Sequence, residues 1–515
     1  MSCSRATCSR RSTASTTSPV TSAGTRWAAA AARAASFRSP SRKGRRTCAS
    51  RKPSSGATSR MIDGLLELAR RRLEQGGGAD ALERRVERTS VAFEWGRLKA
   101  AGVTEEAGVN LRVLHRGRVG VAGTTNVGAE NVGAGDAGAQ HAALLLDRAL
   151  ASAELGEELA LAFPSRAKLP RVTTHVQRTA DASLARLIEI GQFLLERLTR
   201  EGCQVNVAIE RDVSDTRVAN TAGAEGAYRS TGVAVSADVW RIAGDDVLAI
   251  GDAIESTDLP SEDALEGVVR SITSRLDHAL RIVAPPEGAL PVVFTPAGLS
   301  AVLLPVTQGL SGKAVLQGIS PLATRVGQRV FDECFSLTDD PLAPGRTASR
   351  PLDDECVPSR GTGLVERGVV QRFIYDLETA ARATTASTGH GKRGIFGKPV
   401  PGYTNLILGE SGDGRRETWR ELGGGLLKGI NDGLLVDDLI GVGQGNVIGG
   451  AFSHPVALAY RIERGEIAGR VKDAAVAGNV YELLKRIAGL GNDARWTGSR
   501  FTPSLLLEGV AVARR

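Results

Sequence analysis

The sequence predicts an α+β protein in which N-terminal α/β units precede a C-terminal, glycine-rich, mostly β domain with a barrel-like sheet. Before residue 285, helical periods alternate with short apolar strands. From about residue 290 onward, short strands are separated by glycines. The composition agrees, because 61 of the 515 residues are glycine and only 4% are aromatic. We therefore expect a tail over 1–60, α/β units over 61–160 and 170–285, and the β-rich domain over 290–515.

Residues 1–60 are expected to form a disordered basic tail. They hold 13 Lys or Arg and no Asp or Glu, so the formal charge of +8 comes from this segment. The rest of the chain has 52 basic and 57 acidic residues, and nucleic acid is therefore not an expected partner of the body. Met61, one of only two methionines, opens an amphipathic helix and is the predicted start of translation. A targeting or nucleic-acid-binding arm is the alternative for the tail.

The first α/β unit is predicted from two helices and a hairpin. A helix over 61–75 stops at three consecutive glycines, 76–78. Two apolar runs, 109–114 and 119–122, flank a turn at Arg116-Gly117 and indicate a hairpin. A second helix is expected over 138–153.

The second unit repeats the pattern of helix, strands and helix after a linker that contains Pro164 and Pro170. We expect a helix over 181–201 and strands at 205–209, 231–235 and 246–250. Ser261 has the side chain and position of an N-cap for a long amphipathic helix, which Pro285-Pro286 should end. Near the C-terminus, residues 479–487 predict a helix stopped by Gly489.

The cysteines and the hydropathy pattern indicate the cellular compartment of the protein. Three of the six cysteines lie in the tail, and none forms a Cys-x-x-Cys pair, which argues against a disulfide framework or a zinc knuckle. There is no run of 18 apolar residues, so no membrane contact is expected. These features favour a reducing cytoplasm.

Two groups of polar residues could carry chemistry. Asp353-Asp354-Glu355 could hold a cation or act as acid and base, but short carboxylates in a loop more often cap turns. His390 lies in a glycine-rich loop among hydroxyl side chains, although a lone histidine is more often a satisfied core residue. The surrounding G-x-G-x-x-G pattern lacks the strand and helix that a dinucleotide loop needs.

The order of many short motifs in the C-terminal half resembles the TldD/PmbA family, also called modulator of DNA gyrase. No single motif is specific, but their order across about 200 residues is. Cys356 stands where the family usually has glycine, which puts the backbone of that loop in question. The motifs that carry the resemblance are residues 292–294, 318–322, 337–341, 353–360, 366–376, 387–389, 405–406, 450–453, 462–467 and 478–484.

The resemblance also implies that a zinc-binding helix has lost its ligands. TldD-like members of the family carry an H-E-x-x-x-H helix, and matching Leu303-Leu304 and Gly309 to it places Pro305, Val306 and Leu310 at the ligand and base positions. The segment 441–450 has no cysteine to act as a third ligand. The chain is thus similar to the PmbA-like (TldE-like) subunit, for which we expect no catalytic residue, no metal ligand and no cofactor.

What the family implies is a zinc metallopeptidase complex in which this chain is a pseudo-enzyme subunit. Its expected partners are a homologous zinc-bearing TldD-like subunit in a heterodimer, or a second copy in a homodimer, together with an extended peptide that could pair with sheet edges. The residues that the resemblance and the motifs mark for substrate binding or for loops near it are Asp353, Asp354, Glu355, Thr388, Gly389, His390, Asn405 and Ser453.

Two other functions remain open at this level. One is a stand-alone peptide-binding or regulatory protein that modulates gyrase or a toxin–antitoxin system. The other is a zinc-independent hydrolase built around His390 and the acidic trio. The peptide substrate and the identity of the partner are not encoded in any motif.

Overall fold

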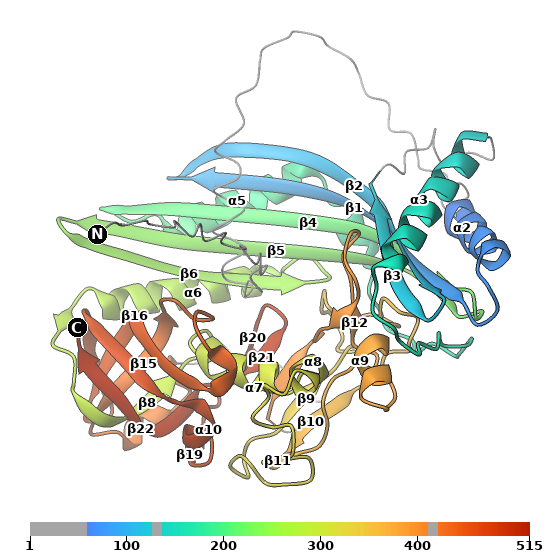
Figure 1. Ribbon diagram of the computed structural model, residues 1–515. Helices are drawn as coiled ribbons and strands as arrows, with labels where there is room; N and C mark the ends of the chain where they lie inside the picture. Colours follow the sequence, from blue (N-terminus) through green and yellow to red (C-terminus); the bar gives the residue numbers. More distant parts are fainter. Residues whose placement is uncertain (1–58, 126–135, 410–420) are drawn as a thin grey trace, which may run out of the picture. The chain divides into compact units, whose positions relative to one another are not determined.

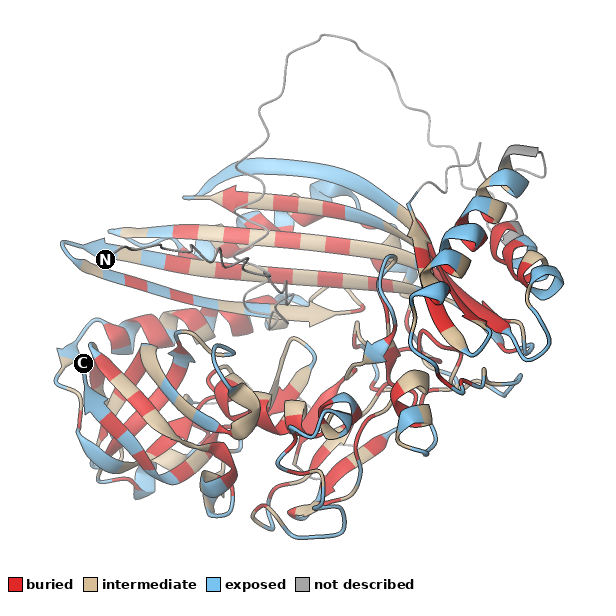
Figure 2. Ribbon diagram, in the orientation of Figure 1, coloured by how far each residue is buried: buried red, intermediate tan, exposed pale blue. Residues whose placement is uncertain are grey.

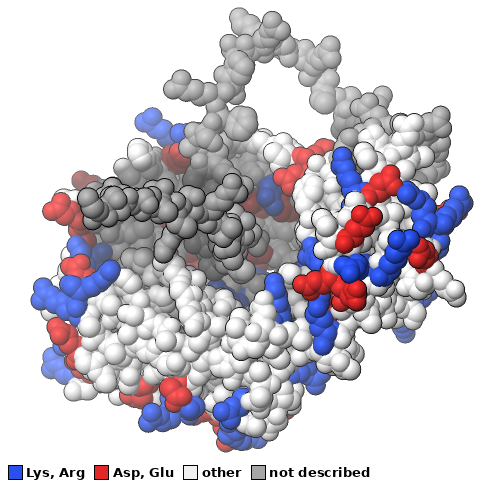
Figure 3. All heavy atoms as spheres, in the orientation of Figure 1, with Lys and Arg blue, Asp and Glu red and all other residues white. Residues whose placement is uncertain are grey.

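The structure is a computed structural model that describes residues 59–125, 136–409 and 421–515. The chain divides into two units, Met1–Pro53 and Ser54–Arg515, and all described residues belong to the second. The predicted basic tail therefore lies outside the described residues, apart from its last two positions. On the face drawn in Figure 3, basic and acidic side chains of the described residues lie interspersed, as the similar numbers of the two in the body lead one to expect.

One antiparallel sheet joins the strands of the two predicted N-terminal units (Figure 1). Its strands are longer than the apolar runs indicated, because pairing extends into segments with charged side chains. The strand β1 pairs with β4 from Asp80↔Asn220 to Phe93↔Val207, so the two units share a single sheet. The order is β3 (Arg118–Thr124), β2 (Arg97–His115), β1 (Gly78–Glu94), β4 (Cys203–Asn220), β5 (Glu225–Ala243) and β6 (Asp246–Ser256).

Five described helices accompany this sheet. At one end, α2 (Ser59–Arg72) and α3 (Asp136–Glu154) pack on β1, β2 and β3 through an apolar cluster. The helix predicted over 181–201 is present as α5 (Leu184–Leu198), which begins where the hydroxyl of Ser183 accepts a hydrogen bond from the N–H of Arg186. A separate short helix, α4 (Gln177–Ala180), precedes it.

The long helix α6 (Glu262–Ala279) begins where the sequence predicts. The hydroxyl of Ser261 accepts from the N–H of Ala264 at 3.3 Å and caps the first turn. The helix ends at Ala279, before Pro285, and a short strand, β7 (Ile282–Val283), follows it. Together with α5, this helix buries apolar side chains between the N-terminal sheet and the C-terminal domain.

The contact of α3 with β3 depends on a glycine, and a substitution there should be costly. A Cβ added to Gly120 would lie 2.0 Å from the carbonyl oxygen of Ala149, which is backbone and has no room to move. Gly120→Ala should lower the free energy of unfolding by about 2 kcal/mol or more, measured by urea denaturation. Gly64→Ala is the control, since nothing lies within 4 Å of its Cβ in α2, and it should stabilise the protein by about 0.5 kcal/mol. Equal effects of the two substitutions would contradict this packing.

The C-terminal domain contains the predicted barrel. Five strands form a closed ring, because β15 pairs with β8 on one side and with β16 on the other. The barrel interior is apolar (Figure 2). Buried positions alternate along part of β22, whereas residues 433–437 of β15 are all buried, because Leu434 and Val436 belong to one apolar cluster and Leu435 to another on the opposite face. Around the ring the order is β15 (Asp432–Leu439), β8 (Gly288–Phe294), β22 (Leu505–Arg514), β18 (Ala474–Asn479) and β16 (Ala451–Glu463), with β17 (Glu466–Val471), β7 and β19 (Ile487–Leu490) attached outside it.

A second, smaller sheet stands beside the barrel. Its order is β11 (Val369–Val370), β10 (Thr362–Glu366), β9 (Leu337–Asp339), β14 (Leu406–Leu408), β21 (Arg500–Thr502) and β20 (Arg495–Thr497), and β12 (Gly391–Lys392) pairs with β13 (Val400–Pro401). Short helices connect these parts: α7 (Ser300–Gly309), α8 (Gly312–Leu316), α9 (Leu377–Arg382), α10 (Val480–Leu483), η1 (Leu426–Gly429) and η2 (Val447–Gly449).

One helix prediction in this domain is wrong. The segment 479–487 is helical only over Val480–Leu483, and Ile487 already belongs to β19. Asn479 caps the helix as a polar side chain should, but pairing of Ile487 with Leu507 places that end of the segment on the barrel sheet. Within the described residues, no helix combines the length and the apolar character needed to span a bilayer.

Candidate functional site

The helix α7 and the residue that caps its C-terminus, Leu310, carry the three positions at which a zinc-binding relative would hold its ligands and base. The helix follows β8, and the N–H of Thr295 donates to the carbonyl oxygen of Val436 on β15 at 3.0 Å, so the helix starts at the end of the barrel. Two tyrosine hydroxyls bind carbonyl oxygens of α7. Tyr481 donates to Pro305 at 2.9 Å, and Tyr403 donates to Thr307 at 2.6 Å.

The side chains at the three positions are carbon and are directed into the protein. Pro305 is buried, and Val306 and Leu310 have no exposed surface and belong to the apolar core of the barrel domain. Zinc needs three nitrogen, oxygen or sulfur ligands and an open position for water. These residues do not fit that ion. Across the described ranges, no three His, Cys, Asp or Glu side chains are grouped so that they could hold a metal.

The glycine-rich segment 441–450 lies against α7. A Cβ on Gly443 would be 3.6 Å from Leu304, and η2 contacts the same helix. Several of its glycines have positive φ, including Gly441 (77°) and Gly443 (94°), so the segment makes turns that other residues rarely adopt. The structure therefore brings together the two segments that the resemblance marked, and neither offers a metal ligand.

The solvent side of α7 is formed by Leu304, Thr307 and Gln308, which are half-buried. The start of β16 supplies Ser453, which is exposed, and the stacked rings of Phe452 and His454, whose centroids are 6.0 Å apart. Burial lowers the pKa of His454 below its ordinary value. Ser453 and His454 thus lie on an accessible strand.

The acidic trio 353–355 lies in a buried ion-pair network. Glu355 Oε1 accepts from Arg112 Nη1 at 2.6 Å, and Arg112 also binds Asp80; Arg112, Asp80 and Glu355 have no exposed surface. Arg393 Nη1 donates to Asp80 at 2.8 Å. Because Arg112 and Asp80 are on the N-terminal sheet while Glu355 and Arg393 are in the C-terminal domain, the network joins the two parts of the body.

The burial of these carboxyls moves their pKa values. Burial raises the pKa of Glu355 to about 8, against the attraction of Arg112. Burial would also raise the pKa of Asp80, but Arg112 and Arg393 attract its carboxylate strongly enough to hold the pKa below its ordinary value. The two carboxyls that share Arg112 therefore differ in the direction of their pKa shifts.

The other two members of the trio bind backbone N–H groups. Asp353 accepts from Glu355, Val357 and Gly391 at 2.8–2.9 Å, as the turn-capping interpretation of the sequence describes. Asp354 accepts from the N–H of Arg393 at 2.9 Å. Cys356, at the position where the family usually has glycine, has φ of 67°, so the loop keeps the left-handed backbone conformation that glycine adopts readily.

His390 is in the core of the small sheet and is 1% exposed. Its Nε2 lies 3.0 Å from Asp339 Oδ2, and its Nδ1 lies 2.9 Å from the hydroxyl of Thr388. The adjacent Gly389 has φ of 78°, which turns the chain so that the ring enters the core. Asn405 is also buried and donates to the carbonyl oxygen of Asp340 at 2.7 Å. These contacts hold loops together, and a substrate has no access to the imidazole.

Sequence reasoning missed the partners of the trio. Arg112 lies within the apolar run 109–114, and Asp80 lies near the start of β1, just after the three glycines 76–78. A charged side chain within an apolar strand was the signal that could have indicated a buried ion pair. The pairing of Arg112 with Glu355 spans 243 residues in sequence and could not be inferred from local patterns. The tyrosines Tyr403 and Tyr481, which bind α7, were also not singled out.

Comparison with known proteins indicates one family. A model described as PmbA/TldA metallopeptidase C-terminal domain matches residues 287–514, and PmbA/TldA metallopeptidase domain 1 matches 79–153. A curated metalloprotease of Methanothermobacter thermautotrophicus is 31% identical over 233 residues, 45% of this chain and 49% of that protein. The metalloprotease PmbA homolog of Haemophilus influenzae is 26% identical over 226 residues, 44% of this chain and 46% of that protein. The chain thus spans about half the length of the curated relatives that it matches.

A solved structure confirms the fold. The crystal structure of TldE from Thermococcus kodakarensis superposes with a TM-score of 0.75 at 23% identity, and the alignment covers 88% of this chain and 100% of that chain. The two segments matched by the family models together make up more than half of the sequence, and the Haemophilus influenzae relative carries the PmbA name. The chain therefore belongs to the TldD/PmbA metallopeptidase family.

Proposed function

We propose that this chain is a PmbA/TldE-like, non-catalytic subunit of a TldD/TldE-type zinc metallopeptidase complex that degrades or processes extended peptides. The observation that carries the proposal is the chemistry of α7, where Pro305, Val306 and Leu310 provide only buried carbon at the family's ligand and base positions. Zinc hydrolysis depends on a bound water that these side chains cannot hold or activate. A homologous zinc-bearing subunit would then supply the reaction.

The N-terminal sheet offers a surface for the other half of this role. Residues 97–108 of β2 pair with β1 on one side, and no described strand pairs with their outer edge. Leu98 and Val103 in this edge are 50% and 56% exposed. An extended peptide can add to such an edge through main-chain hydrogen bonds, which need little side-chain specificity. The edge is therefore a candidate place for substrate or for the partner subunit.

Metal analysis and peptide cleavage test the proposal. The full chain is purified alone and after co-expression with a zinc-bearing TldD-like paralogue, and each sample is measured for zinc per chain and for cleavage of an unfolded peptide. We expect less than about 0.1 zinc per chain and no cleavage for the chain alone, with a chelator-sensitive activity in the complex. Stoichiometric zinc in the lone chain would overturn the proposal. Peptide binding without cleavage, and no complex with the paralogue, would instead favour the stand-alone regulatory function.

A further inference from the structure

The edge of β2 is open over the part of the strand that lies beyond β3. The strand β2 pairs with β1 along its whole length, but with β3 only from Val109 to His115. Among the described residues, 97–108 therefore have a neighbouring strand on one side only. Residues 97–106 are all exposed, and Figure 2 shows this part of β2 as an unbroken pale blue ribbon. We call residues 97–106 the β2 arm.

Both faces of the β2 arm are also uncovered. A strand packed on one face alternates between buried and less buried positions, as β5 does, whereas the arm has ten exposed residues in succession. The apolar cluster around α5 includes Val91 and Phe93 of the neighbouring β1 but no residue of β2. The arm thus presents unpaired main-chain N–H and C=O groups along an uncovered strand, and such edges pair readily with another strand.

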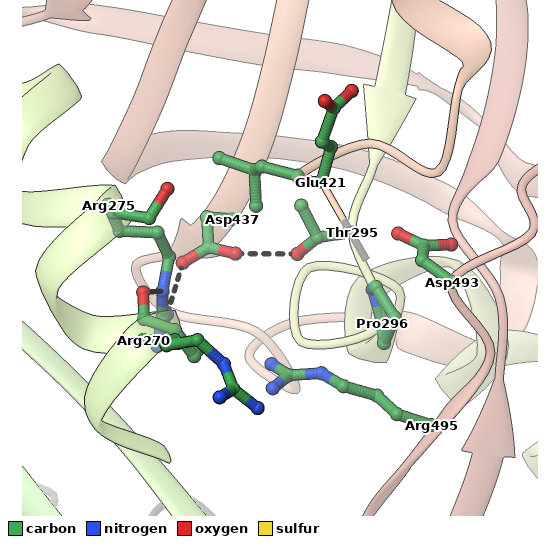
Figure 4. A pocket seen from close by; sticks show the side chains of 11 residues that line it. Arg270, Arg275, Thr295, Pro296, Glu421, Asp437, Asp493 and Arg495 are labelled. Carbon is green, nitrogen blue, oxygen red and sulfur yellow. Dashed lines mark hydrogen bonds and ion pairs between the residues drawn. The ribbon is translucent and has the colours of Figure 1, made fainter. Parts of the chain in front are cut away.

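The opposite edge strand, β6, is engaged with the rest of the chain. Arg275 of α6 donates to the carbonyl oxygen of Gly251 at 2.8 Å, and Arg495 of β20 donates to Asp252 at 2.6 Å. Both arginines line a cavity of about 230 Å³ beside α6, where Figure 4 shows Arg275 directed toward Asp437. The edge that is free for a partner is therefore that of β2.

The charged residues of the β2 arm differ in sign between its two ends. Arg97 and Lys99 stand near its start, Glu105 and Glu106 stand at its end, and the residues between them are uncharged. Arg97 and both glutamates make no ion pair within the described residues. Lys99 pairs with Glu94 at 3.2 Å, but both side chains are exposed, so this pair contributes little to stability.

Two such arms are complementary when they run antiparallel. The cations of each copy then lie opposite the glutamates of the other, whereas a parallel pairing would place like charges side by side. The middle of the arm falls at Ala101 and Gly102, whose small side chains let two main chains approach each other. Val103, which is 56% exposed, would be covered by the second strand.

We propose that the β2 arm pairs antiparallel with the β2 arm of a second copy of this chain, which joins two six-stranded sheets across a two-fold axis near Gly102. An extended peptide would form the same main-chain hydrogen bonds, but a second copy supplies matching charges at both ends by symmetry. This pairing does not rest on the chemistry of α7 or on the subunit role proposed above.

Sedimentation equilibrium of the full chain at about 1–100 µM tests the pairing. Two strand edges form an interface at the small end of the specific range, so we expect a monomer–dimer equilibrium with a dissociation constant of about 10 µM. A chain that stays monomeric, whether or not it binds a zinc-bearing paralogue, would overturn the proposal. No zinc or peptide enters this measurement, so its failure would leave the proposed subunit role standing.

Charge exchange tests which strands meet. Arg97→Glu combined with Lys99→Glu makes the arm wholly acidic, and Glu105→Lys combined with Glu106→Lys makes it wholly basic. Each variant alone should dimerise at least about tenfold more weakly than the unaltered chain, because like charges then meet at both ends. An equimolar mixture of the two should form a dimer of one copy of each, at least as tightly as the unaltered chain.

Glu482→Lys combined with Lys485→Glu is the matched control, because it exchanges the charges of an exposed ion pair outside the N-terminal sheet. It should dimerise like the unaltered chain. All three variants should keep the midpoint of thermal unfolding, since the exchanged side chains are exposed. Acidic and basic variants that dimerise as tightly as the unaltered chain, or a mixture that associates no better than its components, would contradict the pairing.

Discussion

Replacing Val306 by glutamate should lower the free energy of unfolding by about 4 kcal/mol or more. The residue has no exposed surface and lies in the apolar core of the barrel domain, so the carboxylate would be buried without a partner. The same substitution restores the glutamate of the family's zinc helix at the matched position. We therefore expect loss of stability rather than gain of activity, measured by urea denaturation and by zinc content of the purified variant.

Thr307→Glu is the matched control for this experiment. Thr307 is the next residue in α7 and is half-buried, so a glutamate there can extend to solvent and should change stability by about 1 kcal/mol or less.

The effect of Val306→Glu should depend on pH. Burial raises the pKa of a carboxyl group, and burying the protonated form of the new carboxyl destabilises the fold less than burying the ionised form. The loss caused by Val306→Glu should therefore be greater at about pH 8 than at about pH 5.5. A Val306→Glu variant as stable as the control would show that this face of α7 is open.

Replacing Arg112 by methionine should remove about 3–5 kcal/mol of stability. Arg112 is the cation shared by Asp80 and Glu355, and all three side chains are fully buried. Removing one partner of a buried ion pair leaves the other charge uncompensated, which costs more than the pair contributes. Arg393 still binds Asp80, so the loss falls mainly on Glu355 and reaches its full size only above the pKa of about 8, where Glu355 is ionised. Chemical denaturation of the full chain measures the effect.

Arg88→Met is the control for the buried network. Arg88 lies on β1 and pairs with Asp212 at 2.7 Å, but the pair is partly exposed, and its loss should cost about 1 kcal/mol or less.

The pH dependence of the loss caused by Arg112→Met gives a second readout. The pKa of Glu355 is raised from 4.5 to about 8, so stability falls as the pH rises through this window. Without Arg112 the pKa rises further, and the loss should be greater at about pH 9 than at about pH 6. A loss that does not change with pH would contradict the assignment to Glu355.

The structure distinguishes between roles that the sequence left open for the acidic trio and for His390. The acidic trio could have been an acid–base site, but Asp353 and Asp354 bind backbone N–H groups and arginines, and Glu355 pairs with Arg112. His390, the strongest functional candidate among the histidines by sequence, is buried beside Asp339. The side chains on which the hydrolase alternative depends are therefore buried and hydrogen-bonded within the protein.

The sequence by itself determined the features that depend on neighbouring residues. The cap at Ser261, the hairpin around Arg116-Gly117 and the carbon side chains at Pro305, Val306 and Leu310 follow from local composition and period, because capping, turns and metal chemistry act over a few residues. The barrel-like character of the C-terminal half was also readable, since short glycine-punctuated strands favour sheets.

Only the tertiary structure decided which distant segments meet. The pairing of β1 with β4 makes one sheet of two predicted units, the pairing of β15 with β16 closes the barrel, and Arg112 joins Asp80 to Glu355. The end of the segment 479–487 became a strand for the same reason, because burial against Leu507 outweighs helix propensity. Such contacts depend on the summed free energy of the whole packed chain, which cannot be deduced from a short segment of sequence.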